Sequence, residues 1–131
     1  MALNPQYDAI GKAFVQQYYA LFDDPAQRGS LAQLYNPEQS LMSFEGVQVQ
    51  GTAKIMEKFQ SLTFQRIQHS ITATDCQPTF DGGILINILG QLKTDDDPAQ
   101  SFAQTLVLKP ANGSFFLQHD VFRLVLHNMA A

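Results

Sequence analysis

The sequence predicts an α+β domain in which three helices pack against an antiparallel β-sheet. Between Tyr7 and Leu62, apolar residues recur every three to four positions in three stretches, which is the period of amphipathic helices. From Phe64 onward the period falls to two, and turn-forming residues divide the chain into four long runs. The chain has 131 residues, the usual size of one domain, so we expect residues 1–131 to form a single domain.

Two start signals mark the first and second helices. Asn4-Pro5 pairs a capping residue with proline at the first helical position, and the first helix is expected to end near Phe22. Its apolar stripe consists of Tyr7, Ile10, Phe14, Tyr18 and Leu21. Asp24-Pro25 repeats the signal and predicts a shorter second helix, which Gly29 interrupts near its start. The apolar positions of this second helix are Leu31, Leu34 and Tyr35.

A hairpin and a third helix follow. Glu45-Gly46 separates two short runs, Leu41 to Phe44 and Val47 to Gln50, and so predicts a β-hairpin with an acid at its tip. Thr52 is expected to cap the third helix. One stripe of that helix holds Ile55, Met56, Phe59 and Leu62.

Four long strands are expected in the second half of the chain. In the first of them, polar residues alternate with Ile67, His69, Ile71 and Ala73. The runs that follow are Ile84 to Lys93, Ser101 to Lys109 and Phe115 to His127. Short segments rich in Asp, Gly, Asn and Pro separate them, which is typical of an antiparallel meander.

The last of these strands is apolar in both of its phases. One phase holds Phe116, Phe122, Leu124 and Leu126, and the other holds Phe115, Leu117, Val121 and Val125. Because three helices cover only one side of a sheet, we expect a second surface to cover the other side. A homodimer packed sheet to sheet is the economical solution, and a monomer with an unusually apolar outer face is the alternative.

Composition and motifs exclude several classes of function. Asp and Glu number 12 against 8 Lys and Arg, so the formal net charge is -4 and we expect no binding of nucleic acid. The longest apolar stretch, Ile84 to Leu89, is far shorter than the roughly 20 residues of a membrane helix, so we expect no membrane insertion. With one cysteine, scattered histidines and no glycine-rich phosphate loop, we expect no metal, nucleotide or other cofactor.

Catalysis is an alternative that the residues leave open. A sheet curved around helices forms a cone whose mouth can hold a small apolar ligand. The acid and base groups available for proton transfer are Tyr18, Tyr19, His119 and Asp120. No spacing among them requires catalysis, and a polar residue on a strand more often faces a helix end or solvent than a substrate.

Several groups of residues form a combined pattern that covers nearly the whole chain. They are Tyr7-x-x-Ile10-Gly11-x-x-Phe14, Gln17-Tyr18-Tyr19-x-Leu21-Phe22-Asp23, Phe44-Glu45-Gly46, Gln65 to Thr72, Asp75 to Pro78, Gly90 to Lys93 with Asp95 to Pro98, Asp120 to Leu124, and His127-Asn128. The chain resembles the nuclear transport factor 2 family in this pattern. The resemblance implies a cone-like α+β fold, with three helices in the concave face of a strongly bent antiparallel sheet, and a homodimer formed through that sheet.

For function, the resemblance implies a carrier that is not an enzyme. Family members bind the small GTPase Ran in its GDP form and also bind phenylalanine-rich repeats of nucleoporins. They thereby move Ran-GDP through the nuclear pore into the nucleus. A protein of this kind is expected in the cytoplasm and the nucleus, concentrated at the nuclear pore.

The same resemblance assigns the residues that would bind Ran. Glu45 matches an acidic hairpin residue, and Asp95 and Asp97 match acidic loop residues, all of which pair with basic residues of Ran. A phenylalanine of Ran fills an apolar pocket at the mouth of the cone. For the lining of this pocket we expect Phe44 and Phe122, with Leu62, Ile67 and Val121 as weaker candidates.

Two aromatic positions differ from vertebrate members of the family. Phe44 and Tyr7 each stand where those proteins carry tryptophan. The tryptophan at the second position is linked to repeat binding, so Tyr7 is the candidate contact for nucleoporin repeats. Two other functions stay open: a proton-transfer enzyme of the same fold, which needs a polar group at the base of a deep pocket, and a heterodimeric scaffold for messenger-RNA export.

Overall fold

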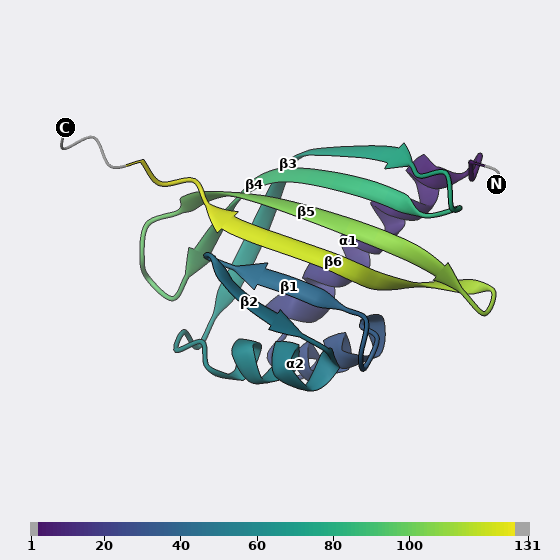
Figure 1. The fold of residues 1–131 in the computed structure, drawn as a ribbon. Helices are drawn as coiled ribbons and strands as arrows, with labels where there is room; N and C mark the ends of the chain where they lie inside the picture. Colours follow the sequence, from purple (N-terminus) through teal and green to yellow (C-terminus); the bar gives the residue numbers. More distant parts are fainter. Residues whose placement is uncertain (1–2, 128–131) are drawn as a thin grey trace.

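The computed structural model describes residues 3–127, with helices and a hairpin in the first half and four long strands in the second (Figure 1). The elements are α1 (Tyr7–Asp23), the 3₁₀ helix η1 (Arg28–Leu34), β1 (Leu41–Phe44), β2 (Val47–Gln50), α2 (Thr52–Gln60), β3 (Ile67–Pro78), β4 (Ile84–Thr94), β5 (Gln100–Ala111) and β6 (Ser114–Leu124). None of the helices in this part of the chain is long and apolar enough to span a membrane.

The six strands form one open sheet in the order β2-β1-β6-β5-β4-β3. Every neighbouring pair is antiparallel except β1 and β6, which run parallel, with Leu41 opposite His119 and Phe44 opposite Phe122. The expectation of a purely antiparallel sheet is therefore wrong at this pair. The hairpin of β1 and β2 follows η1 in the chain, and β1 and β6 are far apart in sequence. Because no short turn joins β1 to β6, these two strands can run parallel.

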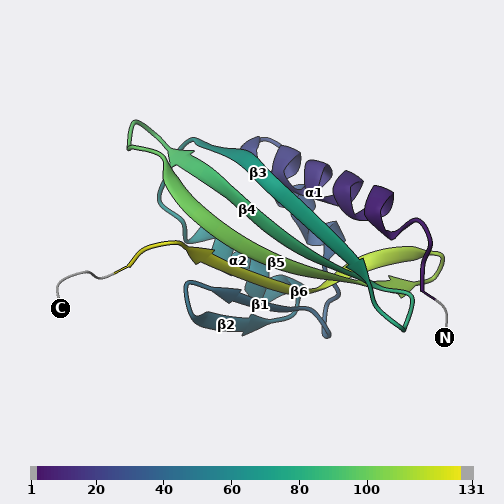
Figure 2. The same cartoon turned by 90° about the horizontal axis from the view of Figure 1, so that it is seen from above.

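The helices pack on the concave side of the long, curved strands. Helix α1 runs along β3 and β4, and α2 lies against η1 and β2 (Figures 1 and 2). Large apolar side chains fill the space between these layers, and several are fully buried, among them Leu31, Ile55, Ile86, Phe102 and Leu106. The expected architecture of three helices on one face of a bent sheet is confirmed.

Two β-bulges shift the inward-facing phase of the long strands. Ile71 pairs with Gly90 and Ala73 pairs with Leu89, so Thr72 is an extra residue in β3. Beyond this bulge, Cys76 instead of Ala73 contacts helix α1, at Gly11. The uninterrupted alternation expected from Ile67 to Ala73 is therefore wrong after His69, and the side chain of Ile71 is 37% exposed.

The second bulge explains why β6 is apolar in both phases. Val107 pairs with His119 and Leu108 pairs with Leu117, which makes Gln118 the extra residue. Leu117 and Phe122, five positions apart, are consequently both buried. The strand ends at Leu124, before the expected His127, and Val121 points away from the helices with 44% of its surface exposed. The double phase thus comes partly from the bulge and is by itself no sign of a covered outer face.

The helix boundaries differ from the expected ones at three points. Helix α1 begins at Tyr7, because Asn4 forms a turn in which its carboxamide oxygen accepts a hydrogen bond from the backbone N–H of Gln6. The expected second α-helix is a single 3₁₀ helix, a form that proteins use in short pieces. The residue before α2 is Gly51 with φ 86°, so Thr52 is the first helical residue and not the cap.

Candidate functional site

A cavity of about 220 Å³ opens between the helices and the concave face of the sheet. Most of its lining is apolar and comes from α1, α2, the segment after α2, and five of the six strands. The apolar lining residues are Phe22, Met42, Phe44, Phe59, Leu62, Phe64, Ile67, Leu92, Phe122 and Leu124. The polar ones are Tyr18, Tyr19, Glu45, His69, Thr94, Gln100, Gln104 and Asp120.

One wall of the cavity is a stack of phenylalanine rings. The ring centroids of Phe44 and Phe122 are 4.7 Å apart at an interplanar angle of 18°, and Phe122 in turn lies 5.7 Å from Phe102. The parallel pairing of β1 with β6 places Phe44 and Phe122 side by side. The ammonium group of Lys58, on α2, lies 5.5 Å from the centroid of Phe44. Flat aromatic surface therefore faces the space, with a cation beside it.

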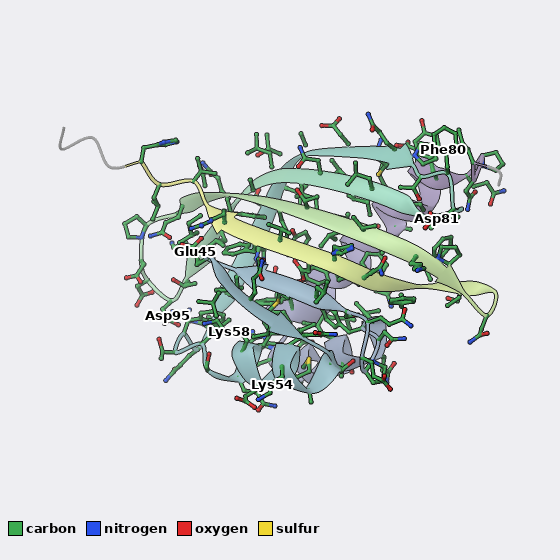
Figure 3. The ribbon with its side chains drawn as sticks, in the orientation of Figure 1. Glu45, Lys54, Lys58, Phe80, Asp81 and Asp95 are labelled. Carbon is green, nitrogen blue, oxygen red and sulfur yellow. The ribbon has the colours of Figure 1, made fainter. Side chains whose placement is uncertain are left out.

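Glu45 stands at the rim of the cavity in a fixed position (Figure 3). It occupies the β1–β2 turn with φ 51°, and its backbone N–H donates to the carbonyl oxygen of Phe122 at 3.1 Å. Its Oε1 accepts a hydrogen bond from the backbone N–H of Leu124 at 2.5 Å. This contact uses one carboxylate oxygen, and the negative charge stays at the cavity mouth.

The loop between β4 and β5 carries three further acids at the same end of the molecule as Glu45 (Figure 3). Asp95 has φ 49°, and its Oδ1 accepts hydrogen bonds from the backbone N–H groups of Gln65 and Arg66 at 3.0 and 2.9 Å. Asp96 forms an exposed ion pair with Arg66, and Asp97 is exposed. None of the three lines the cavity, but Thr94 and Gln100, on either side of the loop, do. The loop acids therefore lie just outside the rim.

The floor of the cavity contains a buried polar network centred on Asp120, which is 1% exposed. Its Oδ2 accepts hydrogen bonds from the hydroxyls of Tyr18 and Tyr35 at 2.9 and 2.8 Å, and its Oδ1 accepts one from the Nε2 of Gln104 at 2.7 Å. The hydroxyl of Tyr19 donates to the side-chain oxygen of Gln104. Burial raises the pKa of Asp120 despite these three hydrogen bonds, and burial together with the charge of Asp120 raises the pKa of Tyr18 and Tyr35 well above the ordinary value.

His69 joins the cavity wall to the end of helix α1. Its backbone N–H donates to Oδ2 of Asp23 at 2.9 Å, and its Nδ1 lies 2.6 Å from Oδ1 of the same carboxylate. The imidazole packs among aromatic rings, with centroids 4.6 Å from Tyr19, 5.4 Å from Phe22 and 5.3 Å from Phe102. The ring is thus held by both hydrogen bonds and packing.

The site offers apolar burial, a negative rim and few free polar atoms. Both oxygens of Asp120 already accept hydrogen bonds from protein groups. Within residues 3–127 there is no group of three or more His, Cys, Asp or Glu side chains arranged to hold a metal ion. The cavity can therefore receive an apolar group of a binding partner. The acids at the rim can orient positively charged groups of that partner around it.

The structure brings most of the expected binding residues together. The cavity lining includes Phe44, Phe122, Leu62 and Ile67, together with Glu45. Val121 instead faces outward, because its neighbours Asp120 and Phe122 occupy the inward positions of β6. Tyr7 begins helix α1 near the N-terminus, at the opposite end of the molecule from the labelled Glu45 (Figures 1 and 3).

Of the groups considered for proton transfer, Tyr18, Tyr19 and Asp120 gather at the cavity floor. His119 does not join them, because it lies next to Asp120 on β6 and so points to the other face of the sheet.

Sequence reasoning missed many residues of the site, and His69 and Lys58 show why. His69 shares the inward phase with Ile67, two positions earlier, and that phase could have placed it in the cavity wall. Lys58 gave no comparable signal, because its position over Phe44 depends on how α2 packs against the hairpin.

Comparisons with known proteins place the chain in a family. The Nuclear transport factor 2 (NTF2) domain matches residues 10–124. A probable nuclear transport factor 2 of Caenorhabditis elegans is 48% identical over 132 residues, covering 98% of this chain and 99% of the relative. Nuclear transport factor 2 of Schizosaccharomyces pombe is 42% identical over 120 residues, covering 90% and 95%.

A solved structure agrees with these sequence matches. Nuclear transport factor 2 from Cryptosporidium parvum superimposes with a TM-score of 0.89 at 45% identity, covering 95% of this chain and 98% of that one. The match extends over the helices and the sheet that build the cavity, and the chain therefore belongs to the nuclear transport factor 2 family.

Proposed function

We propose that the protein is a non-enzymatic carrier that binds Ran in its GDP form and moves it through the nuclear pore into the nucleus. The observation that carries the proposal is the apolar, aromatic-walled cavity with Glu45 at its rim, in a chain whose relatives are named nuclear transport factor 2. In this proposal a phenylalanine of Ran enters the cavity and packs against the stacked rings of Phe44 and Phe122. Basic residues of Ran then face Glu45, Asp95 and Asp97.

The cavity and its rim contribute differently to the binding free energy. Fully burying a phenylalanine side chain contributes roughly 1.5–3 kcal/mol, whereas an exposed ion pair contributes about 0.2–1 kcal/mol. The cavity therefore supplies most of the affinity, and the acids steer the approach and reject partners with the wrong charge pattern. Preference for the GDP form follows if the switch segment of Ran presents its phenylalanine and basic residues in only one nucleotide state.

Calorimetric titration of the purified chain tests this proposal directly. The chain is titrated with Ran loaded with GDP and, separately, with Ran loaded with a GTP analogue. We expect heat of binding with the GDP form alone. Binding to neither form, or equal binding to both, would count against a Ran-GDP carrier.

The carrier is proposed to act as a homodimer through the outer face of the sheet. Leu41, Leu89 and Val121 point away from the helices and are 42%, 47% and 44% exposed, so this face presents apolar surface. A second copy buries it symmetrically. Sedimentation equilibrium distinguishes the outcomes: a stable monomer would contradict the homodimer and favour an export scaffold that pairs with a different chain.

Nucleoporin-repeat binding is proposed for the region of Tyr7. This side chain is partly buried against the core, and it lies far from the cavity mouth, so the carrier can hold Ran and a repeat at the same time. A protein with these two activities is expected in the cytoplasm and the nucleus, concentrated at the pore.

The variant Tyr7→Ala should weaken repeat binding and leave Ran-GDP binding unchanged. The reason is that it removes an aromatic contact at the start of α1 without touching any residue that lines the cavity. Binding of an immobilised phenylalanine-rich repeat peptide, measured beside the calorimetric titration with Ran-GDP, checks both halves. Equal loss of the two activities, with a lowered melting temperature, would show that the substitution acts through stability.

The enzyme alternative has less support in the site. Of the groups considered for proton transfer, Asp120 is held in the fold by hydrogen bonds from Tyr18, Tyr35 and Gln104. His119 lies on the other face of the sheet. Because the relatives that match nearly the whole chain are named as transport factors, we propose binding and release, without chemistry, as the function of the cavity.

A further inference from the structure

We propose that the cavity binds a small neutral aromatic molecule of two fused rings that carries one hydroxyl or N–H donor, with Nε2 of His69 as the hydrogen-bond acceptor. This is a small-ligand site in its own right and needs no partner protein. The ligand class is that of naphthols and indoles. Three features of the cavity support the assignment: its size, a free ring nitrogen in its wall, and the acids at its mouth.

The size and shape of the cavity suit two fused rings. A cavity of about 150 Å³ lined by Leu, Ile and Phe is known to bind benzene. The cavity here is about 220 Å³ and is lined mainly by apolar side chains, with the stacked rings of Phe44 and Phe122 as one wall. A flat bicyclic molecule fills more of this space than benzene does and packs face to face or edge to face against the rings.

The free ring nitrogen is Nε2 of His69. The carboxylate of Asp23 accepts from both the backbone N–H and, at 2.6 Å, the Nδ1 of this residue, which places the ring proton on Nδ1. Neutral imidazole then has a lone pair on Nε2, and this atom has no hydrogen-bond partner among residues 3–127. The side chain is only 4% exposed and lines the cavity, so a donor reaches Nε2 from a molecule inside the cavity.

The other polar atoms of the floor are already paired. The side chains of Tyr18, Tyr19 and Gln104 form hydrogen bonds with one another or with Asp120. A second polar group placed at the floor would therefore lose its water without gaining a new donor or acceptor there. The preferred ligand carries one donor and is otherwise apolar.

The acids at the mouth of the cavity disfavour anions there, whereas the nearby cations Lys58 and Arg28 lie over the rings of Phe44, Phe22 and Phe64. Glu45 carries its carboxylate at the rim, and Asp95 and Asp97 lie just outside it. An aromatic carboxylate of the same size would bring like charge into a space with low dielectric screening. A neutral ligand is therefore selected over its acidic analogue.

Three matched probes test the proposal on the chain alone, so the outcome does not depend on the carrier function. The probes are 2-naphthol, naphthalene and 2-naphthoate, added to protein labelled in its isoleucine methyl groups and observed by NMR. Ile67 lines the cavity, and Ile84 is buried outside it beside Gly11 and serves as the internal control. We expect 2-naphthol to shift Ile67 and leave Ile84 unchanged, to bind about five- to tenfold more tightly than naphthalene, and 2-naphthoate not to bind.

The hydrogen bond to His69 is tested in two independent ways. In the unmodified protein, the ¹⁵N resonance of His69 Nε2 should shift with 2-naphthol and stay in place with naphthalene. The variant His69→Phe keeps an aromatic ring of similar size, and it should bind 2-naphthol no better than naphthalene. The control His127→Phe, at an exposed position, should bind 2-naphthol as the unmodified chain does.

Defined results would overturn the proposal. If no probe shifts Ile67 up to its solubility limit, the cavity is not a small-ligand site. If 2-naphthol and naphthalene bind equally in the unmodified protein, or if Nε2 does not respond, His69 is not the acceptor. The Nε2 measurement decides this even where His69→Phe fails to fold.

Discussion

Replacing Asp120 with alanine should lower the free energy of unfolding by at least about 3 kcal/mol, because it removes the common acceptor of three buried donors. The hydroxyls of Tyr18 and Tyr35 and the amide of Gln104 all donate to this one carboxyl group, and the group itself is 1% exposed. A buried donor left without an acceptor costs about 1–3 kcal/mol. Urea unfolding at fixed protein concentration measures the change.

Tyr35→Phe is the matched control for this prediction. It removes one donor and leaves the carboxyl group with its two other partners, so its cost should be close to that of one hydrogen bond, about 0.5–1.5 kcal/mol. A destabilisation by Asp120→Ala no larger than that of Tyr35→Phe would mean that water enters the cavity floor and satisfies the donors.

The same residue should make stability depend on pH. Burial raises the pKa of Asp120 in the folded protein above the value of about 3.9 expected for an unfolded chain. The folded state therefore holds this proton to higher pH than the unfolded state does. Its contribution to stability is fully present below about pH 3.9 and is lost as pH rises through the raised pKa.

The variant Asp120→Asn cannot titrate at this position and so isolates the effect. The free energy of unfolding of the unmodified protein, minus that of the variant, should fall as pH is raised from about 4 toward 7. A difference that stays constant or rises over this range would show that the three hydrogen bonds outweigh burial.

Local patterns in the sequence predicted those elements whose structure depends only on side-chain periodicity and turn residues. The hairpin of β1 and β2 around Glu45-Gly46 has the expected bounds, and α2 contains the expected stripe of Ile55 and Phe59. These features depend on residues close in sequence, where the side-chain period and the turn residues carry the information.

The features that the sequence did not predict depend on contacts between distant segments. The extra residues Thr72 and Gln118 lie within otherwise regular strands, and only the pairing with β4 and β5 reveals them. The parallel pairing of β1 with β6 likewise follows from how the hairpin packs on η1 and the sheet. This pairing sets Phe44 beside Phe122, so the cavity wall was expected from resemblance, while its geometry came from tertiary packing.

The contact between Asp23 and His69 is another feature that local sequence patterns could not predict. The two residues are 46 positions apart, and no local spacing relates them. They meet because the end of α1 reaches the start of β3. Resemblance identified the surrounding residues as family motifs, but the free ring nitrogen became visible only from the hydrogen bonds.

Glu45→Lys should abolish binding of Ran-GDP, with a loss of at least about 100-fold, or about 2.8 kcal/mol. The substitution places a cation at the cavity mouth, where the proposed partner brings its own basic residues, and like charges at a partly buried site cost several kcal/mol. It also removes the acceptor of the Leu124 backbone N–H, which should lower stability by about 1 kcal/mol without unfolding the chain.

Two controls separate the charge from the hydrogen bond at this position. Glu45→Gln keeps an oxygen that accepts from Leu124 but removes the charge, so it should weaken Ran-GDP binding less than Glu45→Lys while retaining the stability of the unmodified protein. Glu38→Lys makes the same charge change at an exposed position outside the cavity lining. It should change the affinity for Ran-GDP by no more than about twofold, because an exposed charge contributes little to binding. Calorimetric titration with Ran-GDP, beside thermal melts, measures both quantities. If Glu45→Lys binds as the unmodified chain does, Glu45 lies outside the interface, and the partner must enter the cavity from a side that this carboxylate does not face.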